Sequence, residues 1–201
     1  MPKNVYLSMI GILKTKLERF IEVNHELWEE VQRNTTELFI KKGGILIKYG
    51  SIDRNVYVVA SGSFEAILLS TNGNRQVVWF FFDDFSDAAV CMDSHFLGEL
   101  TKYEIKAMED SLVYAFKKSD IDAWLIKYPN FNLFFRSHIL EQLIDQNEIR
   151  NHMVSHTPHD FLQYLKEKYP VILKRTPRKK LAQFMGITPE WLSKITKKSI
   201  L

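Results

Sequence analysis

The C-terminal segment contains the residues whose types and spacing best fit a chemical task. Glu190, Ser193 and Lys194 recur at three- and four-residue steps, so they share one face of a helix that contains them. A carboxylate can accept a hydrogen bond from the amino group of cytosine, and an ammonium can donate to the acceptors of guanine. We therefore interpret these three residues as candidates for reading base edges in the major groove of duplex DNA.

Basic residues surround this face. Residues 174–198 contain eight lysines and arginines and one acid, a net charge of +7, whereas the other 176 residues contain 19 cations and 23 acids, a net charge of −4. Composition alone favours a solvated basic face, but a basic end on a mildly acidic body also fits a module that binds a polyanion. The residues expected to contact DNA phosphates are Arg178, Lys179, Lys180, Thr188, Lys197 and Lys198.

Two Thr-Pro pairs and one glycine would position these residues. Thr176-Pro177 and Thr188-Pro189 each fit a helix cap followed by the first helical residue, and they predict helices over 177–185 and 190–198. Gly186 stands where a left-handed residue would end the first helix. Two helices joined by a tight turn, among many basic residues, are typical of a helix-turn-helix motif. Paired helices with a Gly turn also occur in other helical proteins. The residues expected to point inward or sideways are Leu181, Phe184, Ile187, Trp191, Leu192 and Ile195.

The first part of the chain has a different periodicity. Residues 5–34 are helical in pattern, as one helix or as two with a break near 22–25. Asn72-Gly73-Asn74 predicts a hairpin turn, because both residue types accept positive φ angles. Short strands at this spacing predict an antiparallel roll or a sandwich. The predicted strands are 35–41, 45–49, 55–60, 63–70, 75–82, 103–108 and 111–117.

A long helix is predicted after the strands. Ser119 fits the cap of a helix over 120–127, and residues 131–155 then contain no Gly or Pro. One stripe of that helix fits both a core helix packed on its own roll and a two-stranded coiled coil with Asn147 fixing the register. The stripe contains Leu133, Leu140, Leu143, Asn147 and Val154. A short amphipathic helix from Thr157-Pro158 to Tyr169-Pro170 and a basic loop are expected next.

Composition narrows the classes of function. The chain has 201 residues, of which 46 % are hydrophobic and 25 % charged, and it contains no run near the roughly 20 apolar residues of a membrane helix. The single cysteine, Cys91, excludes an internal disulfide and a cysteine-ligated iron–sulfur cluster within one chain. His152 and His156 lie one helical turn apart, and we interpret them as solvated rather than as zinc ligands. We expect a cytoplasmic protein that is not an enzyme and that has no metal, no cofactor and no membrane partner.

Two stretches carry a family resemblance. They are KKGGILIKYGSIDRNVYVVASGSFEAIL (Lys41–Leu68) and LAQFMGITPEWLSKITKK (Leu181–Lys198). With the order of roll, long helix and helix-turn-helix, they resemble the cyclic-AMP receptor protein/FNR family of bacterial transcription regulators, in a short, divergent Bacteroidetes-type branch. The resemblance implies a homodimer that binds a near-palindromic site on double-stranded DNA, with RNA polymerase as a further partner.

The resemblance also implies the domain organisation and an α+β fold. Residues 1–130 would form an N-terminal cyclic-nucleotide-binding-like antiparallel β-roll, a sensor domain with N-terminal helices. Residues 131–156 would form the dimerisation helix. Residues 157–201 would form the C-terminal helix-turn-helix DNA-binding domain, in which the usual wing is expected to be missing or truncated.

The residues that would bind a cyclic nucleotide depart from the family pattern. Relatives that bind one hold the ribose with a Gly-Glu pair and the phosphate with an Arg-Ser pair. Here residues 84–88 and Thr101-Lys102 stand in those places, and nearby aspartates would repel a phosphate. Control by cyclic nucleotide is therefore not expected, and the effector is left unassigned.

Lys194 stands where the family has Arg, which weakens bidentate guanine recognition. The alternative interpretation is a roll that binds a ligand or a protein and carries a vestigial helix-turn-helix.

Overall fold

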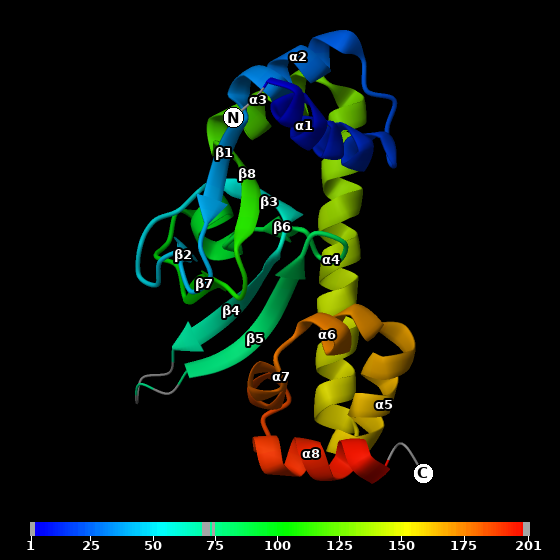
Figure 1. The fold of residues 1–201 in the computed structure, drawn as a ribbon. Coiled ribbons are helices and arrows are strands. Elements are labelled where there is room, and N and C mark those ends of the chain that lie inside the picture. Colours follow the sequence, from blue (N-terminus) through cyan, green and yellow to red (C-terminus); the bar gives the residue numbers. More distant parts are fainter. Residues whose placement is uncertain (1–2, 70–72, 74, 199–201) are drawn as a thin grey trace.

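The computed structural model describes residues 3–69, 73 and 75–198, with side chains placed from residue 11 to residue 197 of those ranges. It consists of a β-roll, a helical cover at the N-terminus, one long helix and a C-terminal group of short helices (Figure 1). None of the described helices is long and apolar enough to cross a membrane.

The N-terminal cover consists of two helices, α1 (Lys3–Glu18) and α2 (His25–Asn34), which decides between the two alternatives predicted for this segment. The side chain of Asn24 caps α2 by accepting a hydrogen bond of 2.8 Å from the amide of Leu27. Leu13, Leu17 and Leu27 are buried against the first sheet of the roll, so both helices belong to the core.

The roll is built from two four-stranded antiparallel sheets, as the strand pattern predicted. The first sheet has the order β1 (Thr36–Ile40), β8 (Ser111–Phe116), β3 (Val56–Ser61), β6 (Ala88–Ala89). The second has the order β2 (Ile45–Ile47), β7 (Tyr103–Ala107), β4 (Ser63–Leu69), β5 (Arg75–Phe82). Antiparallel pairing of β4 with β5 confirms the predicted hairpin, although Asn72 and Asn74 of its turn lie outside the described residues. The two-residue strand β6 and the π-helical turn η1 (Asp93–Leu97) are too short to leave a periodic pattern, and they were not predicted.

Two consecutive helices follow the roll. α3 (Lys118–Lys127) begins one residue after its cap position, Lys117, so the prediction that Ser119 caps it is wrong. α4 (Pro129–Ser155) has 27 residues and is about 40 Å long at 1.5 Å per residue. It runs past the roll from the N-terminal helices to the C-terminal ones (Figure 1).

Four short helices complete the chain: α5 (Pro158–Lys168), α6 (Pro170–Arg175), α7 (Arg178–Phe184) and α8 (Pro189–Lys198). The cap of α5 is confirmed, because Thr157 Oγ1 accepts from the amide of Asp160 at 3.3 Å. The predicted basic loop is wrong: its residues form α6, which begins at Pro170 and buries Ile172. The prediction that Thr176 caps α7 is also wrong, because Pro177 occupies the cap position and the buried Thr176 hydroxyl has no hydrogen-bond partner in the part of the chain that the structure describes.

The C-terminal helices share one hydrophobic core with the roll. Phe80 of β5 and Phe184 of α7 pack with ring centroids 5.1 Å apart, and Phe161 of α5 lies on the other side of Phe184. Burial of such aromatic side chains contributes roughly 1.5–3 kcal/mol each. The C-terminal group is therefore packed on the roll and is not a separate body on a linker.

We expect Gly62→Ala to destabilise the fold by about 2–4 kcal/mol in urea unfolding. Gly62 has φ +96°, and a Cβ there would lie 2.8 Å from the Cα of Ser111. Gly50 has φ +70° and open space around it, so Gly50→Ala should cost only the backbone strain of about 1 kcal/mol. Equal costs for the two variants would contradict the steric explanation.

Candidate nucleic-acid interface

The last two helices form a compact pair joined by a tight turn. Gly186 has φ +66°, which confirms the predicted left-handed residue at the end of α7. The amide of Ile187 donates to the carbonyl of Ala182 at 3.0 Å, which closes the turn. Thr188 Oγ1 accepts from the amide of Trp191 at 3.2 Å and caps α8 as predicted.

One face of α8 is buried and the other is open. Leu192 and Ile195 are buried against the preceding helices, whereas Glu190 and Lys194 are exposed and Ser193 is half-buried. The structure therefore places the three predicted base-reading side chains together on one surface. Trp191, which is expected to point inward or sideways, is 54 % exposed and extends this surface.

The predicted phosphate-contacting residues divide into two groups. Arg178, Lys179 and Lys197 are exposed, and no carboxylate of the described residues lies within ion-pair distance of them. Thr188 is exposed beside them, and the side chain of Lys198 lies outside the described residues. Lys180 differs, because its Nζ lies 2.7 Å from Oε1 of Glu65 in β4. The Glu65 side chain is only 3 % exposed, so Lys180 neutralises a buried carboxylate of the roll.

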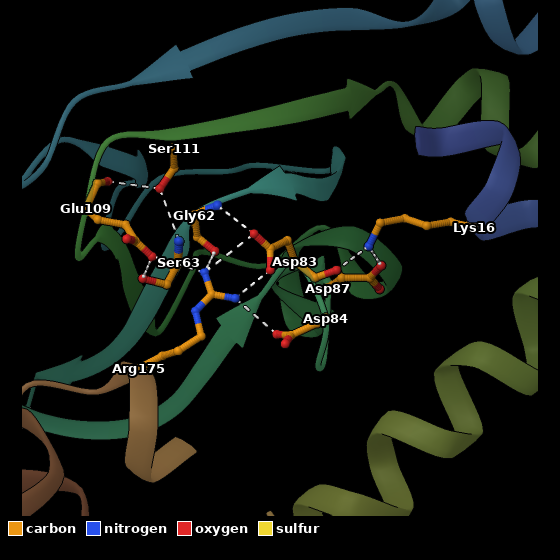
Figure 2. A network of polar contacts seen from close by, with 9 residues as sticks. All are labelled: Lys16, Gly62, Ser63, Asp83, Asp84, Asp87, Glu109, Ser111 and Arg175. Atoms are coloured by element: carbon orange, nitrogen blue, oxygen red, sulfur yellow. Dashed lines mark hydrogen bonds and ion pairs between the residues drawn. The ribbon is translucent and has the colours of Figure 1, made fainter. Parts of the chain in front are cut away.

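A cluster of ionic contacts around Arg175 attaches the C-terminal helices to the roll (Figure 2). The guanidinium donates to Asp83, to Asp84 at 3.0 Å, to Glu109 at 3.1 Å and to the carbonyl of Gly62 at 3.0 Å. Burial lowers the pKa of Arg175, but the hydrogen bonds to Asp83 and Glu109 outweigh it and raise the pKa above its ordinary value. The side chain is permanently charged, so this contact persists at every pH at which the carboxylates are ionised. We call Arg175 with these four partners the Arg175 clamp.

A second ionic cluster joins α1 and α4 to the same loop of the roll. Asp87 accepts hydrogen bonds from Lys16 of α1 and, at 2.9 Å, from Nε2 of His138 of α4. Burial raises the pKa of Asp87, but the hydrogen bond from His138 and the charge of Lys16 together hold it below its ordinary value of 3.8. Figure 2 shows Asp83 and Asp87 pointing to opposite sides of one short loop.

The predicted dimerisation stripe is open along α4. Leu133, Leu140 and Val154 are 64 %, 54 % and 77 % exposed, and Asn147 and Leu143 are exposed between them. The opposite side of α4 buries Phe131 and Ile149 against the rest of the chain. One side of α4 therefore packs on the chain's own core, and the stripe on its other side is exposed in the described structure.

Two cavities lie beside α4. One, of about 520 Å³, lies between the second sheet and the C-terminal half of α4, and its charged lining residues are Asp93 and Arg150. The other, of about 240 Å³, lies between α1, the first sheet and the N-terminal half of α4. Ala88, Val90 and Gln142 line both cavities and thus lie between them.

Residues 37–128 match the family model of the cyclic nucleotide-binding domain. Among solved structures, the c-di-GMP responsive global regulator CLP of Xanthomonas campestris is 14 % identical, with a TM-score of 0.66 over 85 % of this chain and 88 % of that one. FixK2 of Bradyrhizobium japonicum is 17 % identical, with a TM-score of 0.64 over 82 % and 83 %. A putative Crp/Fnr-family regulator of Eubacterium rectale is 15 % identical, with a TM-score of 0.64 over 88 % and 83 %. No curated protein matches the sequence.

The chain has the fold of the Crp/Fnr transcription regulators. This confirms the resemblance at the level of the fold. The similar structures are described as regulators, not as enzymes.

Within the Crp/Fnr fold, the residues at the expected phosphate-binding positions have other partners. Thr101 is buried, and its hydroxyl donates to the carbonyl of Lys48 at 2.6 Å. Lys102 is 59 % exposed and pairs with Asp93 at 3.3 Å. Neither Thr101 nor Lys102 lines the 520 Å³ cavity, as far as the described residues define it.

We expect Arg175→Gln to destabilise the protein by about 2 kcal/mol, because it leaves Asp83 without its cation in a partly buried site. Trypsin should then cut faster near Lys174, since α6 and α7 lose their attachment to the roll. Lys174→Gln removes an exposed neighbouring charge and should change stability by less than about 0.5 kcal/mol. Equal effects of the two variants would show that the Arg175 clamp does not hold the helices.

Asp87→Asn should lower the free energy of unfolding at pH 7 by about 2 kcal/mol, because Lys16 and His138 lose their carboxylate. The folded-state pKa of Asp87 is depressed, so its contribution is present above pH 3.8 and is lost as pH falls through the lower, folded value. The stability difference between wild type and variant should therefore shrink below about pH 4, as the carboxylate of Asp87 is protonated. A difference that stays undiminished down to about pH 2 would contradict this assignment.

Proposed function

We propose that the chain is a homodimeric transcription regulator of the Crp/Fnr type that binds a near-palindromic site on double-stranded DNA. The observation that carries this proposal is the division of α8 into two faces. Leu192 and Ile195 anchor the helix, while Glu190, Lys194 and Lys197 face outward with no ion-pair partner among the described residues. Exposed charges on a rigid, capped helix fit major-groove reading better than a structural role.

In this proposal α7, the turn and α8 act as a helix-turn-helix. Thr188 and the first amides of α8 hold a phosphate at the positive end of the helix dipole. Glu190 then accepts from a cytosine amino group, and Lys194 donates to guanine, with Ser193 beside them. A lysine offers a single ammonium where a guanidinium would bond twice, so Lys194 supplies less discrimination than an arginine would. Arg178, Lys179 and Lys197 add contacts that do not depend on base sequence.

The dimer in this proposal forms along the open stripe of α4. Leu133, Leu140, Asn147 and Val154 are spaced by seven residues, which is the repeat of a two-stranded coiled coil. A paired Asn147 would fix the register. Two copies of α8 would then enter successive major grooves about 34 Å apart.

The proposed regulator does not need a cyclic nucleotide, and RNA polymerase is its further proposed partner. The buried hydrogen bond of Thr101 and the pairing of Lys102 with Asp93 support the first statement, because the Thr101 hydroxyl already has an acceptor and a carboxylate already neighbours the Lys102 charge. Lys180 contacts a DNA phosphate only if its ammonium leaves Glu65, so its proposed role is conditional on breaking this ion pair.

We expect Lys194→Ala and Lys179→Ala to weaken DNA binding in different ways. Loss of Lys194 should relax the preference at one base position in each half-site by about 1–3 kcal/mol. Loss of Lys179 should weaken all sequences alike and reduce the slope of log K against log salt by about 2, one phosphate per protomer. Fluorescence anisotropy with the selected site and a scrambled duplex measures both quantities. If Lys194→Ala weakened both duplexes equally, the base-reading role would be wrong.

We expect Leu140→Asp to convert the protein to a monomer in analytical ultracentrifugation, because it places a carboxylate in the proposed seam. Ile126→Asp is a matched control, since Ile126 of α3 is 87 % exposed and lies outside the stripe. A wild-type protein that sediments as a monomer at micromolar concentration would contradict the proposed dimer.

A further inference from the structure

The 240 Å³ cavity has an apolar wall made by three separate elements. Leu17 comes from α1 and Phe20 from the turn that follows it, Val58 comes from β3, and Phe134 and Phe135 come from α4. Phe20 packs with Phe134 and with His138 at ring-centroid distances of 5.4 Å and 5.7 Å, so aromatic edges and faces line the space. A dry cavity of about 150 Å³ binds benzene in an engineered protein, so 240 Å³ of similar lining accommodates a bicyclic ring.

The charge around this cavity selects against anions. Its lining contains the carboxylates of Asp83, Asp84, Asp87, Glu141 and Asp145, against two cations, Lys16 and Arg19. Lys16 is already paired with Asp87, so it does not offer a free charge to a ligand. A carboxylate or phosphate would therefore meet net repulsion.

The nitrogens of His138 do not offer a hydrogen-bonding site to the cavity. Nε2 lies 2.9 Å from Oδ1 of Asp87, and Nδ1 is buried with almost no accessible surface. The ring contributes its aromatic face and edge to the lining, through its packing with Phe20 and Phe134.

We propose that this cavity is a binding site for a small neutral aromatic molecule of the size of indole or indene. The ring packs on Phe20, Phe134 and Phe135. The site differs from the 520 Å³ cavity on the second sheet, which lies across Ala88 and Gln142 from it.

The site also lies on the loop that holds the C-terminal helices. Asp87 and Asp83 both line the cavity, and Asp83 is the carboxylate of the Arg175 clamp (Figure 2). A ligand that packs against this loop restricts its motion, and the restriction extends to α6 through Arg175. We expect bound indole to slow amide hydrogen exchange in residues 83–89 and in α6. Slowed exchange in the loop with unchanged exchange in α6 would overturn this coupling.

Ligand-observed NMR titration of the full chain tests the site with three probes: indole, indene and benzoate. Indene has the same shape as indole without the N–H, so the apolar lining should bind the two with similar affinity. Benzoate should not bind detectably. Binding of indole at least about tenfold tighter than that of indene, or tighter binding of benzoate, would overturn the proposed chemistry. Absence of indole binding up to its solubility limit would overturn the site.

Two matched variants locate the ligand. Val58 and Val78 are half-buried strand residues, but Val58 lines the 240 Å³ cavity and Val78 the other one. Val58→Phe should abolish indole binding and Val78→Phe should retain it, with circular dichroism confirming that both variants fold. The reverse pattern would place the ligand in the 520 Å³ cavity and overturn the proposal. Because no DNA is present, these outcomes are independent of the proposed DNA-binding function.

Discussion

The orientation of the C-terminal helices depends on the Arg175 clamp. The carboxylate of Asp83 accepts from the amide of Gly62 at 2.9 Å and from Arg175, so it fixes the guanidinium to the turn between β3 and β4. That turn packs so closely on Ser111 that only glycine fits at position 62. The direction of α6, and with it the placement of α7 and α8, therefore follows from a tight turn in the roll. Partly buried ion pairs of this multidentate kind are costly to break, which suits a fixed orientation.

The loop from Asp83 to Asp87 connects the three parts of the molecule. Its first residue holds the C-terminal helices, and its last residue holds α1 and α4 through Lys16 and His138. The contacts of α1 and α4 and the contact of the C-terminal helices thus lie within five residues of chain. This arrangement gives a physical path by which a ligand beside α1 would alter the surface formed by α8.

The sequence predicted regular elements well and contacts between distant residues poorly. Strand periodicity, the Thr157 and Thr188 caps and Gly186 depend on local rules, and the structure agrees with them. Arg175 was counted only as one charge of a basic segment, because nothing local indicates that it meets Asp83, 92 residues earlier. Glu65 within an apolar strand was a usable signal, since a buried acid needs a cation such as Lys180. The exposure of Trp191 depends on where α7 packs, and helical spacing alone does not determine it.

We propose that this chain reads a two-fold symmetric DNA site without an added ligand. Selection from a random duplex library, with the full-length protein at near-physiological salt, is the measurement that decides this. We expect a motif of two inverted half-sites about one helical turn apart, which weakens when Lys194 is replaced by alanine. Enrichment of no motif, or of a motif without two-fold symmetry, would show that the chain does not read DNA in this way.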